Sequence, residues 1–452
     1  MKNANRAPSV ISVCALVLSI NVTRAQDWPQ WRGTNRDGKA AGFTAPKVWP
    51  KALTQLWKVN VGEGVATPSL VGGKLYVFSR QDGREILRCL EAGSGKELWQ
   101  DACDALGANG PASGFSGPRC SPTVAEGKVV TLGVRGVLSC LDAASGKLLW
   151  RKDDFPGALP RFFTSSSPLV ADGLCVAEVG GDGAGGIIAY DLVTGAEKWK
   201  WTGDLPAYAS PVLMSVDGAK YVVAQTEAKM LALALTDGKL MWETPFAGSG
   251  RSYNAATPIV NGQTIIYSGS GRGATAVQLQ KEGSGFAAQP LWKNADNSVK
   301  FDSPVLKDGF LYGITGRNDL FCLNAADGQT VWTSPVTPPA PGATPVPAGD
   351  NPQRGPVPGF GPGSGPGGGG MRGGGGRGGG GREGYGSVVD AGPVLLALTP
   401  ASQLIAFAPG GSAYAELARI KVADSPTYAY PVVSGKRIFI KDQDSVTLWI
   451  VE

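Results

Sequence analysis

The sequence feature that most constrains the fold is a short repeated motif that ends in tryptophan. One copy, Asp142 to Trp150, reads Asp-Ala-Ala-Ser-Gly-Lys-Leu-Leu-Trp, and another runs from Asp191 to Trp199. Five copies place a glycine four residues before the tryptophan, and two degenerate copies keep only the tryptophan. Such recurrence predicts one supersecondary unit repeated along the chain. The tryptophans of the seven copies are Trp57, Trp99, Trp150, Trp199, Trp242, Trp292 and Trp332.

A second motif recurs in register with the first: a small or polar residue, then proline, then alternating apolar residues. Its prolines are spaced by 54, 46, 43, 47, 46, 89 and 38 residues, and the longest interval falls to 40 without the low-complexity stretch 338–386. Two motifs with one period indicate eight units of roughly 45 residues. The eight prolines are Pro68, Pro122, Pro168, Pro211, Pro258, Pro304, Pro393 and Pro431.

Each unit has the pattern of a small antiparallel sheet. In the first unit, apolar runs at 64–71, 74–80, 85–91 and 97–101 predict four strands, and glycines between them supply the positive φ of tight hairpins. The sequence therefore predicts an all-β fold, an eight-bladed β-propeller of four-stranded antiparallel blades. Helix-period segments are nearly absent, which excludes a solenoid of helix pairs.

The two ends of the chain are predicted to complete one blade together. The last unit has strands near 429–434, 436–442 and 445–452 and lacks an outer strand. The orphan run 54–60 carries the tryptophan that an outer strand should have. We therefore expect this N-terminal strand to close the last blade and remove an exposed edge.

The propeller, 54–452, is preceded by two shorter segments. Residues 1–25 have basic residues, a short apolar run and small residues before a cleavage site near Ala25, as in a secretory signal peptide. Residues 26–53 form an N-terminal extension. No run is long and apolar enough to span a membrane. We expect an exported protein, periplasmic or extracellular.

Residues 338–386 interrupt the propeller with a stretch dominated by glycine and proline. Such a composition buries too little apolar surface to offset its ordering entropy, so we expect a disordered insertion. An alternative function is an Arg-Gly tether for a polyanion, because Arg372, Arg377 and Arg382 punctuate the glycines.

Composition and charge exclude several classes of chemistry. The chain contains no histidine, which excludes a Ser-His-Asp triad, a Cys-His nucleophile, a His-ligated zinc and an axial-His haem. The folded part is near neutral once the signal peptide and the insertion are set aside, so duplex nucleic acid is not an expected partner. Six cysteines follow the cleavage site, and the pair best placed for a disulfide is Cys103 with Cys120. The others are expected to be buried thiols.

The Asp-x-x-(Ser/Thr)-Gly-x-x-x-Trp unit resembles the repeat of pyrroloquinoline-quinone (PQQ)-type eight-bladed propellers. The resemblance covers about 56–452 apart from the insertion. In that family the tryptophan packs between neighbouring blades, which implies a structural role in blade docking for all seven tryptophans of the motif. The start of the extension, Asp27-Trp-Pro-Gln-Trp-Arg-Gly33, is also similar to the mature start of exported propeller proteins of this kind.

The family has two functional branches. Quinoprotein dehydrogenases bind PQQ and Ca²⁺ and are associated with an adjacent Cys-Cys pair, a Glu/Asn/Asp calcium set and a catalytic Asp or His. This chain has no Cys-Cys pair and no histidine. The other branch is non-catalytic and is similar to the propeller lipoprotein of the outer-membrane β-barrel assembly machine. The chain resembles this second branch, although its extension lacks the lipidated cysteine.

Bulky polar residues precede the predicted inner strands and should meet at one mouth of the channel. An Arg/Tyr ring suits an anionic ligand or a partner's carboxylates, whereas ordinary solvated loop polarity is the structural alternative. Asp142 and Asp191 lie in tight turns, where backbone capping is the expected role. The predicted rim consists of Arg119, Arg161, Tyr208, Arg251, Tyr253, Lys300 and Tyr428.

These observations predict a non-catalytic binding or scaffolding module, a monomer that holds an envelope protein or an anionic ligand on its rim. No catalytic residue, metal ligand or cofactor is predicted. The alternative is a PQQ- and Ca²⁺-dependent dehydrogenase of alcohols or sugars.

Overall fold

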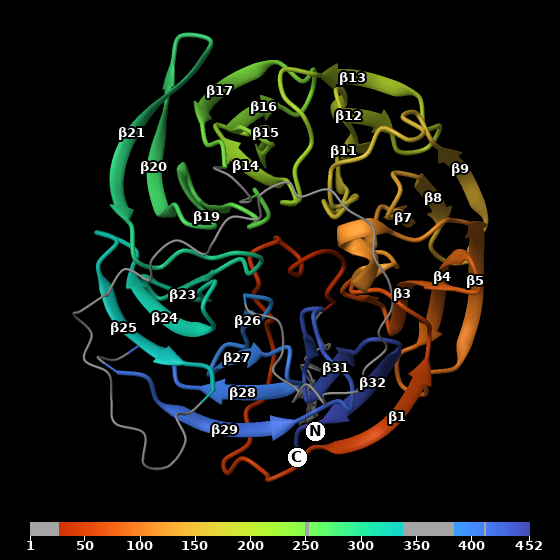
Figure 1. Cartoon of the computed structure of the whole chain (residues 1–452), viewed down its shortest axis with the longest axis vertical. Coiled ribbons are helices and arrows are strands. Elements are labelled where there is room, and N and C mark those ends of the chain that lie inside the picture. The colour runs from red at the N-terminus through yellow and green to blue at the C-terminus, as the bar shows by residue number, and fades with distance from the viewer. Residues whose placement is uncertain (1–26, 249–252, 338–383, 411–412) are drawn as a thin grey trace, which may run out of the picture.

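The fold is a ring of eight antiparallel sheets, each with four strands (Figure 1). The computed structural model describes residues 27–248, 253–337, 384–410 and 413–452. Within these residues the only helical element is η1 (Gly110–Phe115). The predicted eight-bladed β-propeller is therefore confirmed. The predicted signal peptide, nearly all of the predicted insertion and the rim residue Arg251 lie outside the described residues.

The strands of each blade follow one another from the inside of the ring to the outside. Blade 1 contains β2 (Ser69–Val71), β3 (Lys74–Gln81), β4 (Arg84–Glu91) and β5 (Glu97–Asp104). Blade 2 contains β6 (Thr123–Ala125), β7 (Lys128–Leu132), β8 (Leu138–Asp142) and β9 (Leu148–Lys152). Blade 3 contains β10 (Leu169–Ala171), β11 (Leu174–Gly181), β12 (Ala184–Asp191) and β13 (Glu197–Trp201). Blade 4 contains β14 (Val212–Val216), β15 (Ala219–Gln225), β16 (Lys229–Ala234) and β17 (Leu240–Pro245).

The second half of the ring repeats this order. Blade 5 contains β18 (Ile259–Asn261), β19 (Thr264–Gly269), β20 (Gly273–Glu282) and β21 (Gly285–Asn294). Blade 6 contains β22 (Val305–Lys307), β23 (Phe310–Ile314), β24 (Asp319–Asn324) and β25 (Thr330–Pro335). Blade 7 contains β26 (Ser387–Asp390), β27 (Leu395–Leu398), β28 (Gln403–Phe407) and β29 (Glu416–Lys421). Blade 8 contains β30 (Val432–Ser434), β31 (Arg437–Lys441), β32 (Ser445–Ile450) and the first strand of the chain, β1 (Thr54–Asn60).

Blade 8 joins the two ends of the chain, as predicted. Strand β1 pairs with β32 in antiparallel register, from Thr54 opposite Ile450 to Asn60 opposite Ser445. Figure 1 shows β1 as the outer strand beside β32. Because the pairing covers the outer edge of β32, the ring closes without an unpaired strand in this blade.

The tryptophan of each motif packs between its own blade and the next one. Gly146 of blade 2 shows the contact: a Cβ atom there would lie 2.5 Å from the ring of Trp99 in blade 1. Gly195 lies in the same way against Trp150. Several indole N–H groups also donate to a carbonyl of the next blade, for example Trp199 to Leu235 at 2.8 Å. Trp57, Trp242, Trp292 and Trp332 occupy corresponding places at the other blade boundaries.

Seven of the eight motif prolines directly precede the inner strand of their blade. The exception is Pro393, which was predicted to start an inner strand and instead lies between β26 and β27 of blade 7. In several blades the residue before the proline also joins neighbouring blades. The hydroxyl of Ser167 accepts the N–H of Ser121 at 2.9 Å, and the hydroxyl of Ser210 accepts the N–H of Ser167 at 2.9 Å. The pattern continues through Thr257, which accepts from Ser210, and Ser303, which accepts from Thr257. Residues of the second motif are thus linked, backbone N–H to hydroxyl, in a chain of hydrogen bonds from blade 2 to blade 6.

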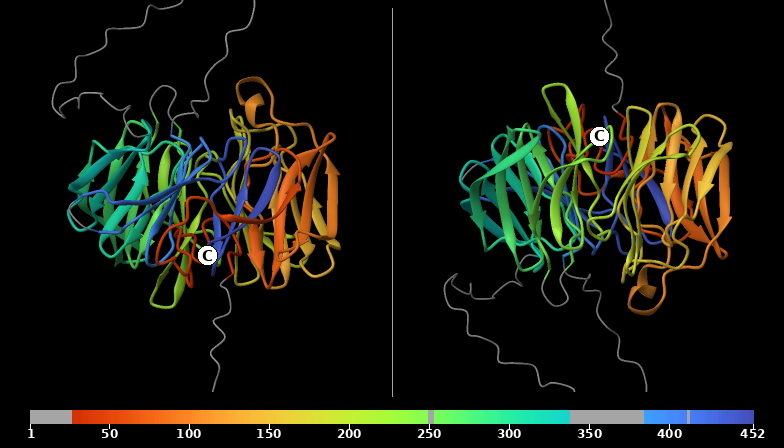
Figure 2. Two further views of the ribbon diagram at one scale, coloured as in Figure 1. Left: turned by 90° about the horizontal axis from the view of Figure 1, so that it is seen from below. Right: turned by 90° about the horizontal axis from the view of Figure 1, so that it is seen from above.

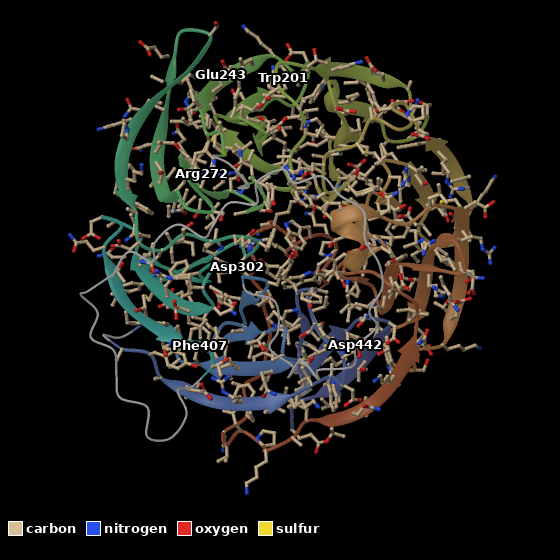
Figure 3. The ribbon with its side chains drawn as sticks, viewed as in Figure 1. Trp201, Glu243, Arg272, Asp302, Phe407 and Asp442 are labelled. Carbon is tan, nitrogen blue, oxygen red and sulfur yellow. The ribbon has the colours of Figure 1, made fainter. Side chains whose placement is uncertain are left out.

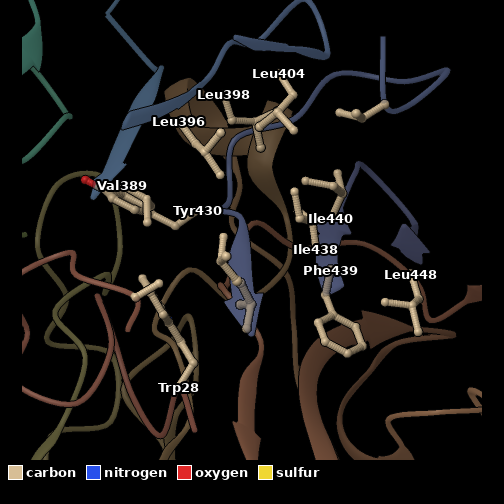
Figure 4. Packing of buried hydrophobic residues seen from close by; sticks show 14 of the residues in the cluster. Trp28, Val389, Leu396, Leu398, Leu404, Tyr430, Ile438, Phe439, Ile440 and Leu448 are labelled. Carbon is tan, nitrogen blue, oxygen red and sulfur yellow. The ribbon is translucent and has the colours of Figure 1, made fainter. Parts of the chain in front are cut away.

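The N-terminal extension crosses the centre of the ring instead of lying outside it (Figure 1). Trp28, which is 1% exposed, pairs with Leu70 of blade 1, and its ring belongs to the largest buried cluster, seen in Figure 4. Pro29 accepts the N–H of Val124 in blade 2 at 2.8 Å. The segment therefore begins its contacts at the first two blades.

Two buried arginines of this segment bind backbone carbonyls of inner strands. Arg36 donates to Ser167 and Pro211, at 3.0 and 2.9 Å, and so joins blades 3 and 4. Arg32 donates to Pro304 of blade 6 at 2.7 Å and to the hydroxyl of Tyr430, next to blade 8, at 3.0 Å.

Blades 5 and 7 are reached by neighbouring residues of the same segment. The indole N–H of Trp31 donates to Thr257 at 2.8 Å, and the N–H of Ala40 donates to Asp390 at 2.8 Å. Residues 28–40, which we call the hub, thus contact all eight blades. In Figure 2 the N-terminal segment lies toward the face of the ring opposite to η1.

Among the described residues no helix has the length and apolar character needed to cross a membrane.

Candidate functional site

One face of the ring carries a collar of aromatic side chains. Each belongs to a connection that leads from the outer strand of one blade to the inner strand of the next. Seven of the eight connections contribute one ring each to the collar, and all seven rings are half-buried. In chain order they are Phe115, Phe162, Tyr208, Tyr253, Phe301, Tyr385 and Tyr428.

The collar is divided into two aromatic walls. In the first wall, the ring of Tyr385 stacks on Phe301 at 4.2 Å between centroids and lies 5.4 Å from Tyr428. Phe115 completes this wall, 5.0 Å from Tyr428 and 5.5 Å from Tyr385. The contacts join rings from four connections, so the wall spans several blades.

The second wall consists of Phe162, Tyr208 and Tyr253. The ring of Phe162 meets that of Tyr253 edge-on at 4.7 Å, and the Tyr208 and Tyr253 rings lie 6.0 Å apart. The hydroxyl of Tyr208 accepts the N–H of Phe162 at 3.0 Å. Edge-on ring contacts and this hydrogen bond fix the orientation of the wall.

A cationic side chain lies at each of the two junctions between the walls. Arg119 follows Phe115 and precedes Phe162 along the chain, and its guanidinium donates to the carbonyls of both. Desolvation by burial lowers the pKa of Arg119. Lys300 lies between Tyr253 and Phe301 in the sequence, and its Nζ lies 5.2 Å from the centroid of the Phe301 ring.

The walls and cations enclose a cavity of about 320 Å³. Trp31 of the hub also lines it, and its N–H is held by Thr257. A second cavity of about 680 Å³ adjoins the first and shares Pro111, Tyr208 and Tyr253 with it. Arg161, Asp182 and Glu227 bring charge of both signs to this second cavity.

The structure brings most of the predicted rim residues together. Five line the first cavity, namely Arg119, Tyr208, Tyr253, Lys300 and Tyr428. Arg161 lines the second cavity and is exposed.

The prediction missed the apolar half of the site and its floor. Phe301, Tyr208 and Tyr428 each stand three residues before an inner-strand proline. The same spacing would have identified Phe301, but the predicted rim included polar residues alone. Trp31 carried no comparable signal, because its place depends on the path of the hub through the ring.

Buried carboxylates support the loops that carry the collar. Glu178 accepts the N–H of Ala207, the residue before Tyr208, at 3.1 Å, and burial raises the pKa of Glu178 to about 8. Asp302 follows Phe301 and accepts the N–H of Ile314 at 2.8 Å. Burial raises the pKa of Asp302 to about 6, and Figure 3 shows this residue near the centre of the ring. Both carboxylates act from behind the collar.

A third buried carboxylate, Glu85, accepts the N–H of Val134 at 2.7 Å, and burial raises its pKa to about 7. The carbonyl of Val134 in turn accepts the N–H of Thr164, close to Phe162. The second wall is therefore fixed through two carboxylates, Glu85 and Glu178.

The predicted disulfide between Cys103 and Cys120 is not formed in this structure, where both are free thiols. Cys120 is fully buried in the cluster between blades 2 and 3. Cys103 lies on the outer strand β5, opposite Glu85 of β4. Cys103 thus belongs to the outer strand of blade 1, whereas Cys120 precedes the inner strand β6 of blade 2. In the described part of the chain no three His, Cys, Asp or Glu side chains gather as a metal site.

Comparison with known proteins gives one family match. A model of the family described as outer membrane protein assembly factor BamB matches residues 83–334. Among relatives, BamB of Xanthomonas campestris is 25% identical over 239 residues, which are 50% of this chain and 56% of that protein. The quinohemoprotein alcohol dehydrogenase of Comamonas testosteroni is 28% identical over 215 residues, 44% of this chain and 28% of that protein. The match thus spans about half or less of each of these relatives.

Solved structures share the fold at low identity. BamB from Moraxella catarrhalis aligns with a TM-score of 0.56 and 13% identity, over 88% of this chain and all of that one. The quinohemoprotein alcohol dehydrogenase of Comamonas testosteroni aligns with a TM-score of 0.64 and 14% identity, over 95% of this chain and 81% of that one. At such identities the likeness concerns the fold alone, which the two proteins share despite their different names.

Proposed function

Because this chain belongs to the family of PQQ-like repeat propellers described as outer membrane protein assembly factor BamB, we propose that it is a binding or scaffolding module without catalytic activity. It holds a protein partner or an anionic ligand on its channel rim. We propose further that it is exported, works in the cell envelope and acts as a monomer. The names of the relatives support this assignment, since assembly factors occur repeatedly among them.

The observation that carries the proposal is the collar. Aromatic rings offer large contact area at low entropic cost, and cations among them attract carboxylates or phosphates. The rings come from seven different connections, which a rigid ring of blades holds in place. Half-buried rings on a rigid support are suited to binding, because they lose little conformational freedom when a ligand covers them.

A PQQ-dependent dehydrogenase is the second candidate, and dehydrogenases among the relatives favour it. The residues of the first cavity fit PQQ itself, because aromatic walls, Arg119 and Lys300 suit a planar polyanion. They do not fit the calcium ion, which needs six to eight oxygen ligands. The lining residues contribute no carboxylate or amide, and Asp302 is already bound to Ile314 and Tyr430. We therefore derive no reaction through this cofactor.

The test compares capture of an envelope partner with cofactor binding. The purified protein is immobilised, exposed to envelope extract and compared with Lys300→Gln, in which a rim charge is lost, and with Lys239→Gln, an exposed turn residue of blade 4. We expect a partner that Lys300→Gln loses and Lys239→Gln keeps. In parallel, PQQ with Ca²⁺ is titrated by absorbance, with dye-linked oxidation of alcohols and sugars as readout. Saturable binding with turnover would overturn the proposal in favour of the dehydrogenase.

A further inference from the structure

We propose that the collar recognises an acidic, aromatic-bearing peptide segment of its partner, with an aromatic side chain between the two walls and carboxylates beside Arg119 and Lys300. This inference rests on the proposed function and names the chemistry of the ligand. It follows from the order of groups around the collar, from what the lining lacks, and from the shape of the joined cavities.

The order of the connections places the two cations apart. Around the ring the sequence is Phe115, Arg119, then the second wall, then Lys300, then the rest of the first wall. The cations therefore occupy the two junctions between the walls. A slot with aromatic sides and a cation at either junction matches a flat side chain flanked by anionic groups.

The lining of the first cavity also determines which ligands it does not suit. Its described lining residues include two cations and no Asp, Glu, Asn or Gln. Lys300 has no carboxylate within ion-pair distance among the described residues. The side-chain acceptors of the lining are hydroxyl groups of serine and tyrosine, so a neutral ligand would leave the two cations without a counter-charge. The positive charge is complementary to carboxylates that the ligand itself must supply.

The two joined cavities favour a chain molecule over a small one. The second cavity continues from the first across Tyr208 and Tyr253, and its lining mixes Arg161 with Asp182 and Glu227. A planar molecule would fill the first cavity and leave the second without contacts. An extended peptide can place its anchoring side chain in the first cavity and continue over the two tyrosines into the second.

The hub requires entry from the collar face. Trp31 lies at the inner end of the first cavity, and the hub behind it binds carbonyls of the inner strands. A ligand cannot thread through the ring while these contacts hold. The partner therefore presents a chain end or the tip of a loop.

The probe is an N-acetylated, C-amidated peptide of sequence Gly-Asp-Phe-Glu-Phe-Gly, titrated calorimetrically into the full chain at low salt. The matched peptide Gly-Asn-Phe-Gln-Phe-Gly removes the charges alone. We expect the acidic peptide to bind at least about tenfold more tightly than the amide peptide, since charge-assisted contacts are lost in the latter. Lys300→Gln should weaken the acidic peptide several-fold and leave the amide peptide unchanged, whereas Lys239→Gln should change neither.

The outcomes separate this inference from the proposed function. Equal affinity for the two peptides, or binding that Lys300→Gln does not weaken, overturns the peptide inference even if an envelope partner is captured through the rim. Binding of PQQ without binding of either peptide also overturns it and favours a small planar anion. If neither the peptides nor any envelope partner depends on Lys300, the proposed function fails with it. Because Arg119 also holds two backbone carbonyls, Lys300 is the safer residue to change.

Discussion

At the scale of single residues, the packing of the tryptophan motif depends on its glycine as well as on the tryptophan ring. Gly146 has a φ of 74°, and a Cβ atom would enter the Trp99 ring. Gly127, in the first hairpin of the same blade, has a φ of 73° and no atom near the place of a Cβ. The two glycines therefore share a left-handed backbone conformation and differ in packing.

This difference makes a prediction about the free energy of unfolding. Gly127→Ala should cost about 1 to 2 kcal/mol, the penalty of a left-handed residue with a Cβ. Gly146→Ala should cost about 1 to 3 kcal/mol more, because the Trp99 ring must move. Urea unfolding of both variants measures the two values. Equal losses would mean that the blade boundary tolerates the methyl group and that close packing on Trp99 is not required.

The buried Glu178 predicts how stability depends on pH. Burial raises the pKa of Glu178 in the folded state to about 8, above its ordinary value of 4.5, so the protonated form favours the folded state. The stability it contributes is complete below about pH 4.5 and is lost as the pH rises toward 8. Over this window the free energy of unfolding should fall by about 1.4 kcal/mol per pH unit. Asp302 and Glu85, with pKa values raised to about 6 and 7, add to it at the lower pH values.

Glu178→Gln keeps an acceptor for Ala207 and removes the titration. Its free energy of unfolding, measured at pH 5, 6, 7 and 8, should fall less steeply than that of the unchanged protein. Glu282→Gln, at an exposed position on β20, should leave the slope unaltered. A slope that Glu178→Gln does not change would show that this carboxyl is already ionised in the folded state at pH 6.

The sequence predicted those site residues that combine a repeated position before a strand with a polar or charged side chain. Arg119 and Lys300 were found because they precede repeated strands. Phe115 and Phe162 were missed because apolar rings before a strand resemble core residues until the connections are placed around one axis. The carboxylates behind the collar had no sequence signal either. Glu178 lies in an apolar strand, and its partner Ala207 is far along the chain.

At the scale of elements, the hub was the main feature that sequence analysis did not anticipate. The extension has no strand or helix period, so its place could not be read from pattern alone. Arg36 and Arg32 act through carbonyls of inner strands, and those carbonyls converge only after the ring has formed. The motif hydroxyls show the same limit. Proline marked the start of the inner strand in every blade except blade 7, where Pro393 follows β26, yet the hydrogen bond from Ser121 to Ser167 depends on the neighbouring blade.

The hub predicts a large effect from one buried arginine. Arg36→Met removes donors from the carbonyls of Ser167 and Pro211, which remain buried. Each buried carbonyl left without a donor costs about 1 to 3 kcal/mol, so the variant should unfold at clearly lower urea concentration. Arg84→Met, at an exposed position on β4, is the matched control and should change stability by less than about 0.5 kcal/mol. Similar midpoints for the two variants would show that the hub arginines contribute little to the ring.

At the scale of the whole molecule, one N-terminal segment closes the ring and the segment before it fills the centre. Strand β1 completes blade 8, whereas residues 28–40 contact all eight blades from within. The repeat predicted closure by β1 because one blade lacked its outer strand. The repeat could not predict the hub, since no single unit of the repeat contains the contacts that the hub makes.

Two N-terminal deletions should therefore fail in different ways. A variant that begins at Leu53, after an initiator methionine, loses the hub and keeps β1, so we expect a monomer that unfolds at lower temperature. A variant that begins at Val61 also loses β1 and exposes the edge of β32 (Ser445–Ile450), which can pair with another chain. Light scattering after gel filtration should show self-association only in the second. If both variants remain monomeric with the same melting temperature, β1 does not protect that edge, and the ring is held closed by other contacts.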